Sequence, residues 1–590
     1  MRSATCLARG IRRALLAGPA GGCLAICLAS CLAACTPVSP GVPGVFGGGA
    51  RVDGSARDDR VILGSLAYVA GLAVSRRYVF AVGDGTVAAY DRQLERWLPP
   101  AAGPALRADE PVGAVAADPS EDALWIGVPG AVLTFRPFSG ELTRTLVAGN
   151  VDRIIFDAGD PGRGAFVRAG GAWTRVTPTG LVTPALPAEL PRADSAIASP
   201  TLEELYRQFP GLRSSAALLT RGDGVRSWPV TAGARAPERD VVYLGTYGNG
   251  IFEVDPVFGE STRLPFGLLE PGAGALALAS DGVWVASGAG GAVLASRVRG
   301  GLTFVGDDLQ QWRWVAGDEL GRLLSGSRAL DLAVRDGTAW IATDRGLVQT
   351  SVEVSDEVRY WGRLRGLPAD RVTTLVVRDY GVWAGTARGL ALVSPDFQVA
   401  RTVLPGLSVR ALLADGDSLW VGTESGLFVL PRASEAAADE EGLTAADADP
   451  AIPPLGRPAF MRARALEGES RLRTPIHALA GADGMLYVAT AEGVLVLGEA
   501  GPPVLPRLSA VDFGRVGGVT TLAVDAGTLW VGGRRGLLVV DRDSETSRLL
   551  AVGTDLPGEV TDVALAPGLA WVATSEGVVR FRRLADGSVR

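Results

Sequence analysis

The segment Trp383-Ala-Gly-Thr-Ala-Arg-Gly-Leu390 decides the fold, because similar segments recur through the C-terminal half of the 590-residue chain. In each copy an aromatic residue opens a short apolar strand, Gly or Ala stands two positions later, and a turn ending in Gly precedes an aliphatic residue. Glycine adopts the positive φ of a tight turn at no steric cost, so the pattern predicts a β-hairpin. The copies begin at Trp340, Trp383, Trp420, Tyr487, Trp530 and Trp571.

Looser copies extend the repeat into the N-terminal half, and they begin at Phe80, Trp125, Phe166, Tyr243 and Trp284. Where nothing is inserted, successive aromatic anchors are about 42 residues apart, which is the length of one four-stranded propeller blade. Eleven anchors are more than the roughly four to eight blades of a single ring. We therefore predict an all-β fold, a β-propeller array of about eleven or twelve four-stranded blades in two rings.

The boundary between the two rings is expected near residues 300–328, where Trp312-Arg-Trp314 lies outside the repeat. We assign residues 61–316 to an N-terminal propeller and residues 317–590 to a C-terminal propeller. The apolar segment Val61-Ile-Leu-Gly-Ser-Leu66 leaves an alternative open, since it can supply the outer strand that the last blade lacks. In that case one ring contains both ends of the repeat region, and the boundary at 316/317 is wrong.

The repeat resembles that of the two-component-regulator propeller family, whose unit also contains an apolar strand, a Leu-Trp-x-Gly-Thr segment, two variable residues and Gly-Leu. The resemblance covers most of residues 61–590 and implies a propeller, which in family members is often a periplasmic ligand sensor. The printed sequence ends at Arg590, just after the last repeat, without the membrane helix and kinase of such sensors. We therefore expect no direct signalling.

The first 34 residues have the composition of a secretory targeting peptide, with four arginines before an apolar stretch. The segment Leu32-Ala-Ala-Cys35 resembles the lipobox of bacterial lipoproteins. The resemblance implies cleavage before Cys35 and lipidation of its thiol, with enough acyl chains for stable anchoring. We assign residues 1–34 to a signal peptide and residues 35–60 to the lipidated cysteine and a flexible tether. Cys31 is a poorer alternative for lipidation, and an uncleaved membrane helix is disfavoured by the Gly and Pro interruptions.

Composition excludes several kinds of chemistry. All five cysteines lie at or before Cys35, the chain has one histidine, and we find no lysine. Disulfides in the body, zinc sites built from Cys or several His, and a Lys Schiff base are therefore excluded. We interpret His477 as an ordinary strand side chain, because sibling repeats place other polar residues in its register: Thr373, Arg410, Thr520 and Thr561. We expect no metal, no cofactor and no catalysis.

The charge of the chain excludes another class of partner. Loss of the four arginines among residues 1–34 changes the net charge from −7 to −11, and the remaining body has no basic run. An acidic surface repels the phosphate backbone, so we expect no nucleic-acid binding.

Departures from the repeat are where we expect function. The insertion 184–226 contains Thr201-Leu-Glu-Glu204, a capping box that predicts a short helix. The acidic segment 434–450 does not match an EF-hand and is interpreted as a solvated loop. We choose four candidate binding residues because they lie in atypical loops or outside the repeat: Tyr247, Asn249, Trp312 and Trp314.

These observations favour an exported protein that is lipid-anchored to a bacterial membrane, expected to be the outer membrane. We expect a binding or scaffold function, in which the propeller surfaces bind an envelope protein partner. The alternative is an extracytoplasmic sensor or enzyme that binds a small ligand or a glycan in the propeller funnel.

Overall fold

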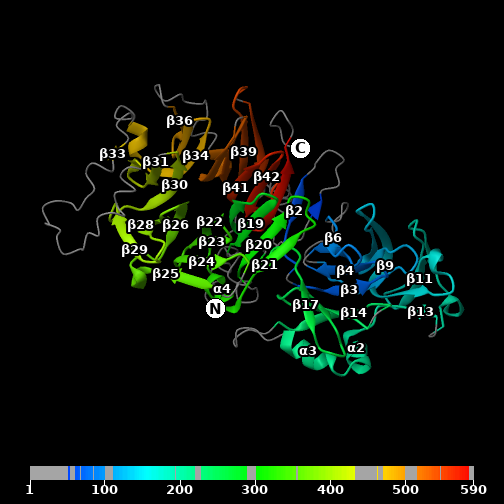
Figure 1. The fold of residues 1–590 in the computed structure, drawn as a ribbon. Helices are drawn as coiled ribbons and strands as arrows, with labels where there is room; N and C mark the ends of the chain where they lie inside the picture. Colours follow the sequence, from blue (N-terminus) through cyan, green and yellow to red (C-terminus); the bar gives the residue numbers. More distant parts are fainter. Residues whose placement is uncertain are drawn as a thin grey trace, which may run out of the picture. The chain divides into compact units, whose positions relative to one another are not determined.

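Strands make up 57% of the computed structural model and helices 8%, which confirms the prediction of an all-β fold (Figure 1). Most strands form antiparallel sheets of four strands that are consecutive in the sequence. The structure describes residues 51–52, 60–66, 68–83, 85–99, 106, 110–192, 195–219, 228–238, 240–270, 272–288, 300–353, 357–416, 418–431, 461–462, 470–498, 514–525, 527–544 and 546–583.

The sheet of residues 372–403 shows how one repeat folds. Its strands β26 (Val372–Arg378), β27 (Gly381–Thr386), β28 (Gly389–Val393) and β29 (Val399–Val403) pair in chain order. The anchor Trp383 is fully buried between Val376 and Leu392 on the neighbouring strands. A Cβ on Gly385 would lie 2.6 Å from a methyl group of Val409 in the next sheet, so glycine is needed for the two sheets to pack closely.

Six further sheets of the C-terminal half follow the same plan. Their strands are β18 (Ala273–Leu278), β19 (Gly282–Ser287), β20 (Leu302–Gly306) and β21 (Trp312–Val315); β22 (Ala329–Arg335), β23 (Thr338–Thr343), β24 (Leu347–Ser351) and β25 (Val358–Trp361); β30 (Val409–Asp415), β31 (Ser418–Thr423), β32 (Gly426–Pro431) and β33 (Met461–Arg462); β34 (Ile476–Ala482), β35 (Met485–Thr490) and β36 (Gly493–Gly498); β37 (Val519–Val524), β38 (Thr528–Gly533), β39 (Gly536–Asp541) and β40 (Ser547–Ala551); β41 (Val560–Ala566), β42 (Leu569–Thr574) and β43 (Gly577–Arg582).

The first strands of these seven sheets contact one another in a circular order: β18, β22, β26, β30, β34, β37, β41 and again β18. Hydrogen bonds join neighbouring sheets along this circle. The Thr373 hydroxyl donates to the carbonyl of Val409 (2.6 Å), and the Thr561 hydroxyl donates to the carbonyl of Ala273 (2.7 Å). The last sheet in the chain therefore bonds directly to the sheet of β18.

A strand from the start of the described chain completes the last sheet. β2 (Val61–Leu63) pairs antiparallel with β43, with Val61 opposite Arg580, and β1 (Arg51–Val52) pairs with β2. This is the pairing that the alternative ring arrangement required. The sheet β18–β21, which the boundary at 316/317 placed in the N-terminal propeller, contacts both β22 and β41.

The N-terminal half contains two four-stranded sheets and one larger sheet. Contacts between first strands run from β14 to β3 and from β3 to β7, and β7 also contacts β9 of its own sheet. The strands are β3 (Gly71–Val74), β4 (Tyr78–Gly83), β5 (Thr86–Asp91) and β6 (Arg96–Trp97); β7 (Ala114–Ala117), β8 (Leu124–Arg136), β9 (Glu141–Asp157), β10 (Ala165–Ala169), β11 (Ala172–Val176), β12 (Val182–Pro184) and β13 (Ala196–Ile197); β14 (Val230–Arg235), β15 (Val242–Thr246), β16 (Ile251–Val254) and β17 (Ser261–Leu264).

The larger sheet differs from the two separate blades expected around Trp125 and Phe166. β9 runs unbroken for 17 residues, pairing with β8 through its first part and with β10 through its last part. The chain does not turn away between the two repeats, because residues 147–150 continue the strand through an irregular stretch in which Gly149 has a φ of 93°. The repeat pattern identified the two anchors but not the continuous strand between them.

The predicted helix in the insertion is confirmed. α2 (Leu202–Gln208) begins after Thr201, whose hydroxyl accepts from the N–H of Glu204 (3.3 Å), while the Glu204 carboxylate accepts from the N–H of Thr201 (2.7 Å). Leu205 is fully buried in a cluster with Val242 and Leu244 of β15. The sequence pattern did not reveal α3 (Leu212–Leu219) or α4 (Asp318–Leu324), which lack a side-chain cap.

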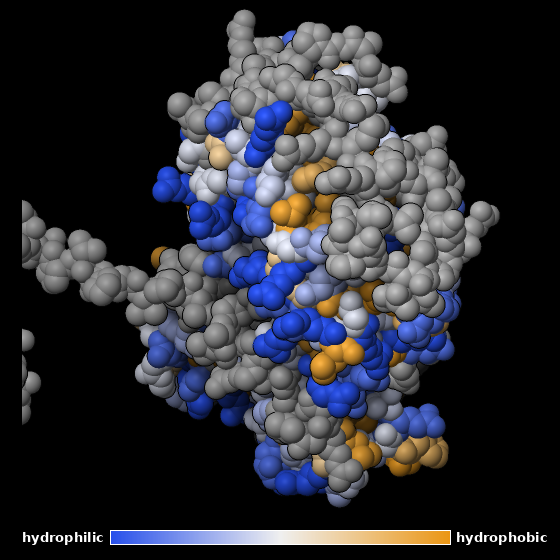
Figure 2. Space-filling view, turned by 90° about the vertical axis from the view of Figure 1, so that its left-hand side faces the viewer, coloured by the Kyte–Doolittle hydropathy of each residue, from blue (hydrophilic) through white to orange (hydrophobic). Residues whose placement is uncertain are grey.

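On the face drawn in Figure 2, the hydrophobic residues that are coloured form several separate patches among hydrophilic ones. The most exposed large apolar side chains of the described residues include Phe138, Phe258 and Leu364.

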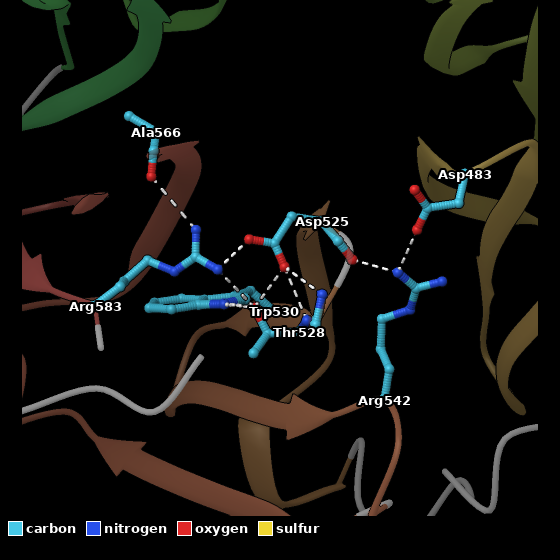
Figure 3. Close-up of polar contacts among 8 residues, drawn as sticks. Asp483, Asp525, Thr528, Trp530, Arg542, Ala566 and Arg583 are labelled. Atoms are coloured by element: carbon cyan, nitrogen blue, oxygen red, sulfur yellow. Dashed lines mark hydrogen bonds and ion pairs between the residues drawn. The ribbon is translucent and has the colours of Figure 1, made fainter. Parts of the chain in front are cut away.

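A polar network ties three neighbouring sheets together at the turns between their first and second strands (Figure 3). Arg583, which follows β43, forms an ion pair with Asp525, which follows β37. Arg542, which follows β39, donates to the Asp525 carbonyl and to the Asp483 carboxylate (2.8 Å) after β34. Burial disfavours the Asp525 carboxylate, but hydrogen bonds from Thr528 and Arg583 outweigh burial and lower the Asp525 pKa.

Candidate functional site

Tyr247 and Asn249 lie in the loop between β15 and β16, where they are engaged by the protein itself. Asn249 is 5% exposed, donates to the carbonyl of Leu219 at the end of α3 (3.1 Å) and accepts from Arg263 (2.9 Å). The half-buried Tyr247 ring lies 5.2 Å from the ring of Tyr68. The loop therefore joins the helical insertion to the sheet β14–β17.

Trp312 and Trp314 of β21 also pack internally. The Trp312 indole is 6% exposed, donates to the carbonyl of Leu309 (3.1 Å) and lies 5.0 Å from the Phe266 ring. The Trp314 indole donates to the carbonyl of Gly267 (2.9 Å), and a Cβ on Gly250 would lie 2.8 Å from its ring. The structure thus brings Trp314 against the Tyr247 loop, and a binding role for these four residues stays a prediction. Cys35 and the acidic segment 434–450 lie outside the described residues.

A cavity of about 640 Å³ lies where the first strands of the seven sheets meet. Each sheet contributes the second residue of its first strand to the lining. These residues are Gly274, Leu330, Thr373, Arg410, His477, Thr520 and Thr561.

A β-bulge explains why the same position faces the cavity in every sheet. In β26 the pairing with β27 joins Val372 to Thr386 and then Thr374 to Gly385, so Thr373 has no partner opposite it. The other six first strands show the same register shift around their second residue. A bulged residue leaves the ladder and changes the direction of its side chain. The repeat therefore directs one residue per sheet toward a common centre, and six of the seven residues supply a side chain, since Gly274 has none.

The bulge position is the variable position of an otherwise regular repeat. Thr373, Thr520 and Thr561 use their hydroxyls to bond the next first strand. Arg410 and His477 replace this threonine in adjacent sheets, and their polar groups approach each other, with Arg410 Nη1 3.5 Å from His477 Nδ1. Among the described residues, neither side chain bonds the backbone of the next first strand, and both line the cavity.

Arginine dominates the charged lining of the cavity. Arg328 and Arg371 immediately precede β22 and β26, Arg410 is on the β30 bulge, and Arg534 lies in the turn after β38. All four are exposed. Among the described residues, no carboxylate forms an ion pair with any of the four, and Glu559 is the only acidic residue of the lining. A chain with a net charge of −7 thus presents a positively charged cavity.

His477 lies on strand β34 at the bulge, which is the strand position that its register predicted. Its half-buried ring lines the cavity, and burial together with the positive charge of Arg410 lowers its pKa below the usual value. The sequence signal was present, because a position that varies among Gly, Leu, Thr, Arg and His is framed by nearly constant neighbours. The bulge directs this variable position toward the cavity, so its variation sets the chemistry of the cavity lining.

A second cavity of about 640 Å³ lies outside this centre, beside β25. Its charged lining is balanced, with Asp344 and Asp370 beside Arg345 and Arg363. Within the described parts of the chain, no cluster of three or more His, Cys, Asp or Glu could hold a metal ion. The described helices include none that is both long and apolar enough to cross a membrane.

The repeated antiparallel sheets define the class of this chain as an all-β repeat protein. The sequence matches no protein-family model and no curated protein sequence. Among solved structures, the chain is similar to PorZ, a surface component of the type-IX secretion system of Porphyromonas gingivalis, with 13% identity, a TM-score of 0.44, and coverage of 89% of this chain and 87% of PorZ. It is also similar to the extracellular domain of BT4673 from B. thetaiotaomicron, with 13% identity, a TM-score of 0.27, and coverage of 92% and 82%.

The computationally designed protein Ika8 is a third neighbour, with 16% identity, a TM-score of 0.34, and coverage of 60% of this chain and 95% of Ika8. Likenesses at these TM-scores support no assignment of function.

Proposed function

We propose that this chain is an exported, lipid-anchored binding protein whose ligand occupies the cavity at the centre of the seven sheets. One observation carries the proposal: all seven bulged residues, one from each sheet, line the same cavity. Ligand sites combine a concave surface with a few convergent polar groups, which is what this lining supplies. The cavity thus favours binding of a small ligand over a scaffold function, and we propose no catalytic step.

The proposed architecture is a seven-bladed propeller closed by β2 on β43. The circular contacts of the first strands support the ring, and the pairing of Val61 with Arg580 supports its closure. On this proposal the boundary between the two groups of sheets lies near residues 265–272 instead of 316/317. The N-terminal group then contains the sheets from β3 to β17.

Membrane attachment through Cys35 is the second part of the proposal. It rests on the lipobox-like segment Leu32-Ala-Ala-Cys35. The Cys35→Ser variant, expressed in a bacterium with metabolic labelling by a fatty-acid analogue, is expected to lose the label and to accumulate as an uncleaved precursor. Unchanged labelling in this variant would refute attachment at Cys35, and a Cys31→Ser variant would then identify the attachment site.

The test of ligand binding uses a variant that fills the cavity. Ala387 lines the cavity from the turn between β27 and β28, where its side chain makes no hydrogen bond, so Ala387→Trp adds bulk without removing an interaction. A thermal-shift screen with small anions, neutral sugars and polyamines is expected to find a ligand that stabilises the wild type but not Ala387→Trp. A ligand that stabilises both proteins equally would contradict the proposed site.

Docking of an envelope protein is a second candidate function, and one surface favours it. Val257 and Phe258, in the turn between β16 and β17, are 71% and 80% exposed. The turn touches the helical insertion, where a Cβ on Gly259 would lie 3.4 Å from the Ser215 hydroxyl, and Leu218 of α3 is 63% exposed. A cross-linking experiment on intact cells compares the wild type with Phe258→Ser. Loss of a specific cross-linked partner in the variant would support docking, and identical cross-links would reject this surface.

A further inference from the structure

We infer that the ligand of the central cavity is a small, multiply charged anion, held by Arg328, Arg371 and Arg410 with His477 beside them. The inference rests on the proposed function, because it names the class of ligand for the same cavity. The relevant chemistry is that of carboxylate and phosphate groups.

Unpaired guanidinium groups are the first support. Arginine presents planar donors that match carboxylate and phosphate oxygens in pairs, and such charge-assisted hydrogen bonds are stronger than neutral ones. The described residues offer Arg328, Arg371 and Arg410 no carboxylate partner within 4.0 Å. By contrast, Arg144, Arg168 and Arg235 in the N-terminal half each pair with an acid. The cavity arginines are therefore free to bind a ligand.

Convergence is the second support. The three arginines come from consecutive sheets, those of β22, β26 and β30, and the next sheet contributes His477. Arg534 adds a fourth positive charge from the sheet of β37, although its Nε also donates to the carbonyl of Gly517 (3.3 Å). A concave surface lined with one sign of charge concentrates ions of the opposite sign. Since the rest of the chain is acidic, anions are directed to this cavity and repelled elsewhere.

The number of arginines indicates more than one negative charge on the ligand. Three guanidinium groups on three sheets cannot all approach a single carboxylate with good geometry, whereas a ligand with several carboxylates, or a phosphate with three free oxygens, can engage them together. Glu559 immediately precedes β41, which is two or three places from β22, β26 and β30 in the circular order of first strands, and its negative charge disfavours an anion that fills the whole cavity. The ligand is thus expected to lie toward the β22–β30 side.

Because Arg410 lies close to His477, we expect the affinity for the anion to depend on pH. The charged groups that line the cavity with His477 are Arg328, Arg371, Arg410, Arg534 and Glu559. Burial and the positive charge of Arg410 lower the pKa of His477. An anion bound between Arg410 and His477 offsets the repulsion from Arg410, so ligand binding and protonation of His477 favour each other. For an anion whose own charge does not change over the pH range, affinity is therefore expected to rise as the pH falls, and less so in His477→Gln.

Isothermal titration calorimetry on the full chain tests the inference with citrate, inorganic phosphate, glucose and spermidine as probes. Citrate or phosphate is expected to bind, while glucose and spermidine are not. The Kd of the bound anion should increase about tenfold or more in Arg371→Gln/Arg410→Gln, because two charge-assisted contacts are lost. Arg207→Gln on α2 is the matched control, since it removes one exposed arginine far along the chain and should leave the Kd unchanged.

Different binding results would overturn the anion inference alone or the proposed function as well. Failure of citrate and phosphate to bind at about 10 mM, or equal binding to the wild type and the double variant, overturns the anion inference. If a neutral ligand instead binds the wild type and is excluded by Ala387→Trp, the cavity remains the ligand site and only the anion inference fails. If Ala387→Trp leaves the binding of every probe unchanged, the proposed function fails as well.

Discussion

Asp562 shows how one buried carboxylate joins three sheets. Its oxygens accept hydrogen bonds from the N–H of Leu276 on β18 (2.8 Å), from the N–H of Val563 (2.8 Å) and from the Thr521 hydroxyl on β37 (3.3 Å). Burial raises the pKa of Asp562 to about 7, and the charge of Asp331 adds to the effect. Burial also raises the pKa of Asp331, whose carboxylate accepts hydrogen bonds from the Thr374 hydroxyl and the N–H of Leu375 in the next sheet.

The raised pKa of Asp562 predicts a loss of stability as the pH rises. In the unfolded chain the carboxyl ionises near pH 4, whereas in the folded protein it stays protonated up to about pH 7. The protonated Asp562 carboxyl thus makes its full contribution to the free energy of unfolding below pH 4, and this contribution is lost as the pH rises through 7. Thermal unfolding followed by circular dichroism between pH 4 and pH 8 should show a smaller decrease in Tm for Asp562→Asn than for the wild type. The exposed Asp543→Asn is the control, and equal pH slopes in all three proteins would refute the assignment.

The threonine that ends the second strand of a repeat holds the following turn through its hydroxyl. The Thr386 hydroxyl is fully buried, donates to the carbonyl of Gly389 (2.7 Å) and accepts from the N–H of Arg388 (3.2 Å). Thr386→Val keeps the shape but removes both of these hydrogen bonds, which predicts a destabilisation of about 1–3 kcal/mol. Urea unfolding measures it, with the exposed Thr402→Val as the control. A difference of less than about 0.5 kcal/mol between the two variants would show that the hydroxyl is dispensable.

Some of these residue roles could be predicted from the sequence and others could not. The repeated aromatic, small residue and Thr identified the second strand and its turn, because each has a local steric or hydrogen-bonding reason. The cavity role of His477 depends on a register shift that only strand pairing reveals. Trp312 and Trp314 drew attention as unusual residues, but their contacts with Phe266 and Gly250 come from segments distant in the sequence. Local patterns in the sequence predicted the repeat. The lining of the cavity depends on strand pairing between distant segments, which those patterns do not show.

At the scale of elements, turns of neighbouring sheets are joined by charge. Asp525 holds its own turn through Thr528 and reaches the last sheet through Arg583 (Figure 3). The same turn meets Asp483 of the preceding sheet through Arg542. The sequence could not predict this network, since its members come from three different repeats and only their neighbourhood gives them partners.

We predict that removal of the Asp525 side chain weakens the contact between these sheets. Asp525→Ala leaves the largely buried Arg583 without its carboxylate partner, and such a loss costs about 3 kcal/mol or somewhat less at a partly exposed site. Hydrogen exchange measured by mass spectrometry should show faster exchange in β41–β43 than in the wild type. Asp379→Ala, which removes the partner of the exposed Arg335, is the control and should cost well under 1 kcal/mol. Unchanged exchange in β41–β43 would mean that the network adds nothing to the contact between the sheets.

At the scale of the whole molecule, β2 brings the start of the described chain to its last sheet. Leu63 is fully buried, and its carbonyl lies close to Gly577 at the start of β43. Leu63→Asp places an unpaired polar group in this position, which predicts a destabilisation of several kcal/mol and early proteolysis of β41–β43. Leu94→Asp, at a half-exposed turn position, is the control. If both variants resist limited proteolysis equally, β2 does not close the seven sheets.

The central claim is that the cavity formed by the seven bulged strands binds a small, multiply charged anion, and residues 36–590 contain no cysteine that would interfere with a thiol probe. The measurement is the alkylation rate of Ala387→Cys in a full chain whose five N-terminal cysteines are serine, with and without citrate. Ser214→Cys, exposed on α3, is the control. Citrate is predicted to slow alkylation at position 387 and not at position 214. Equal rates at position 387 with and without citrate, and again with and without inorganic phosphate, would contradict the claim.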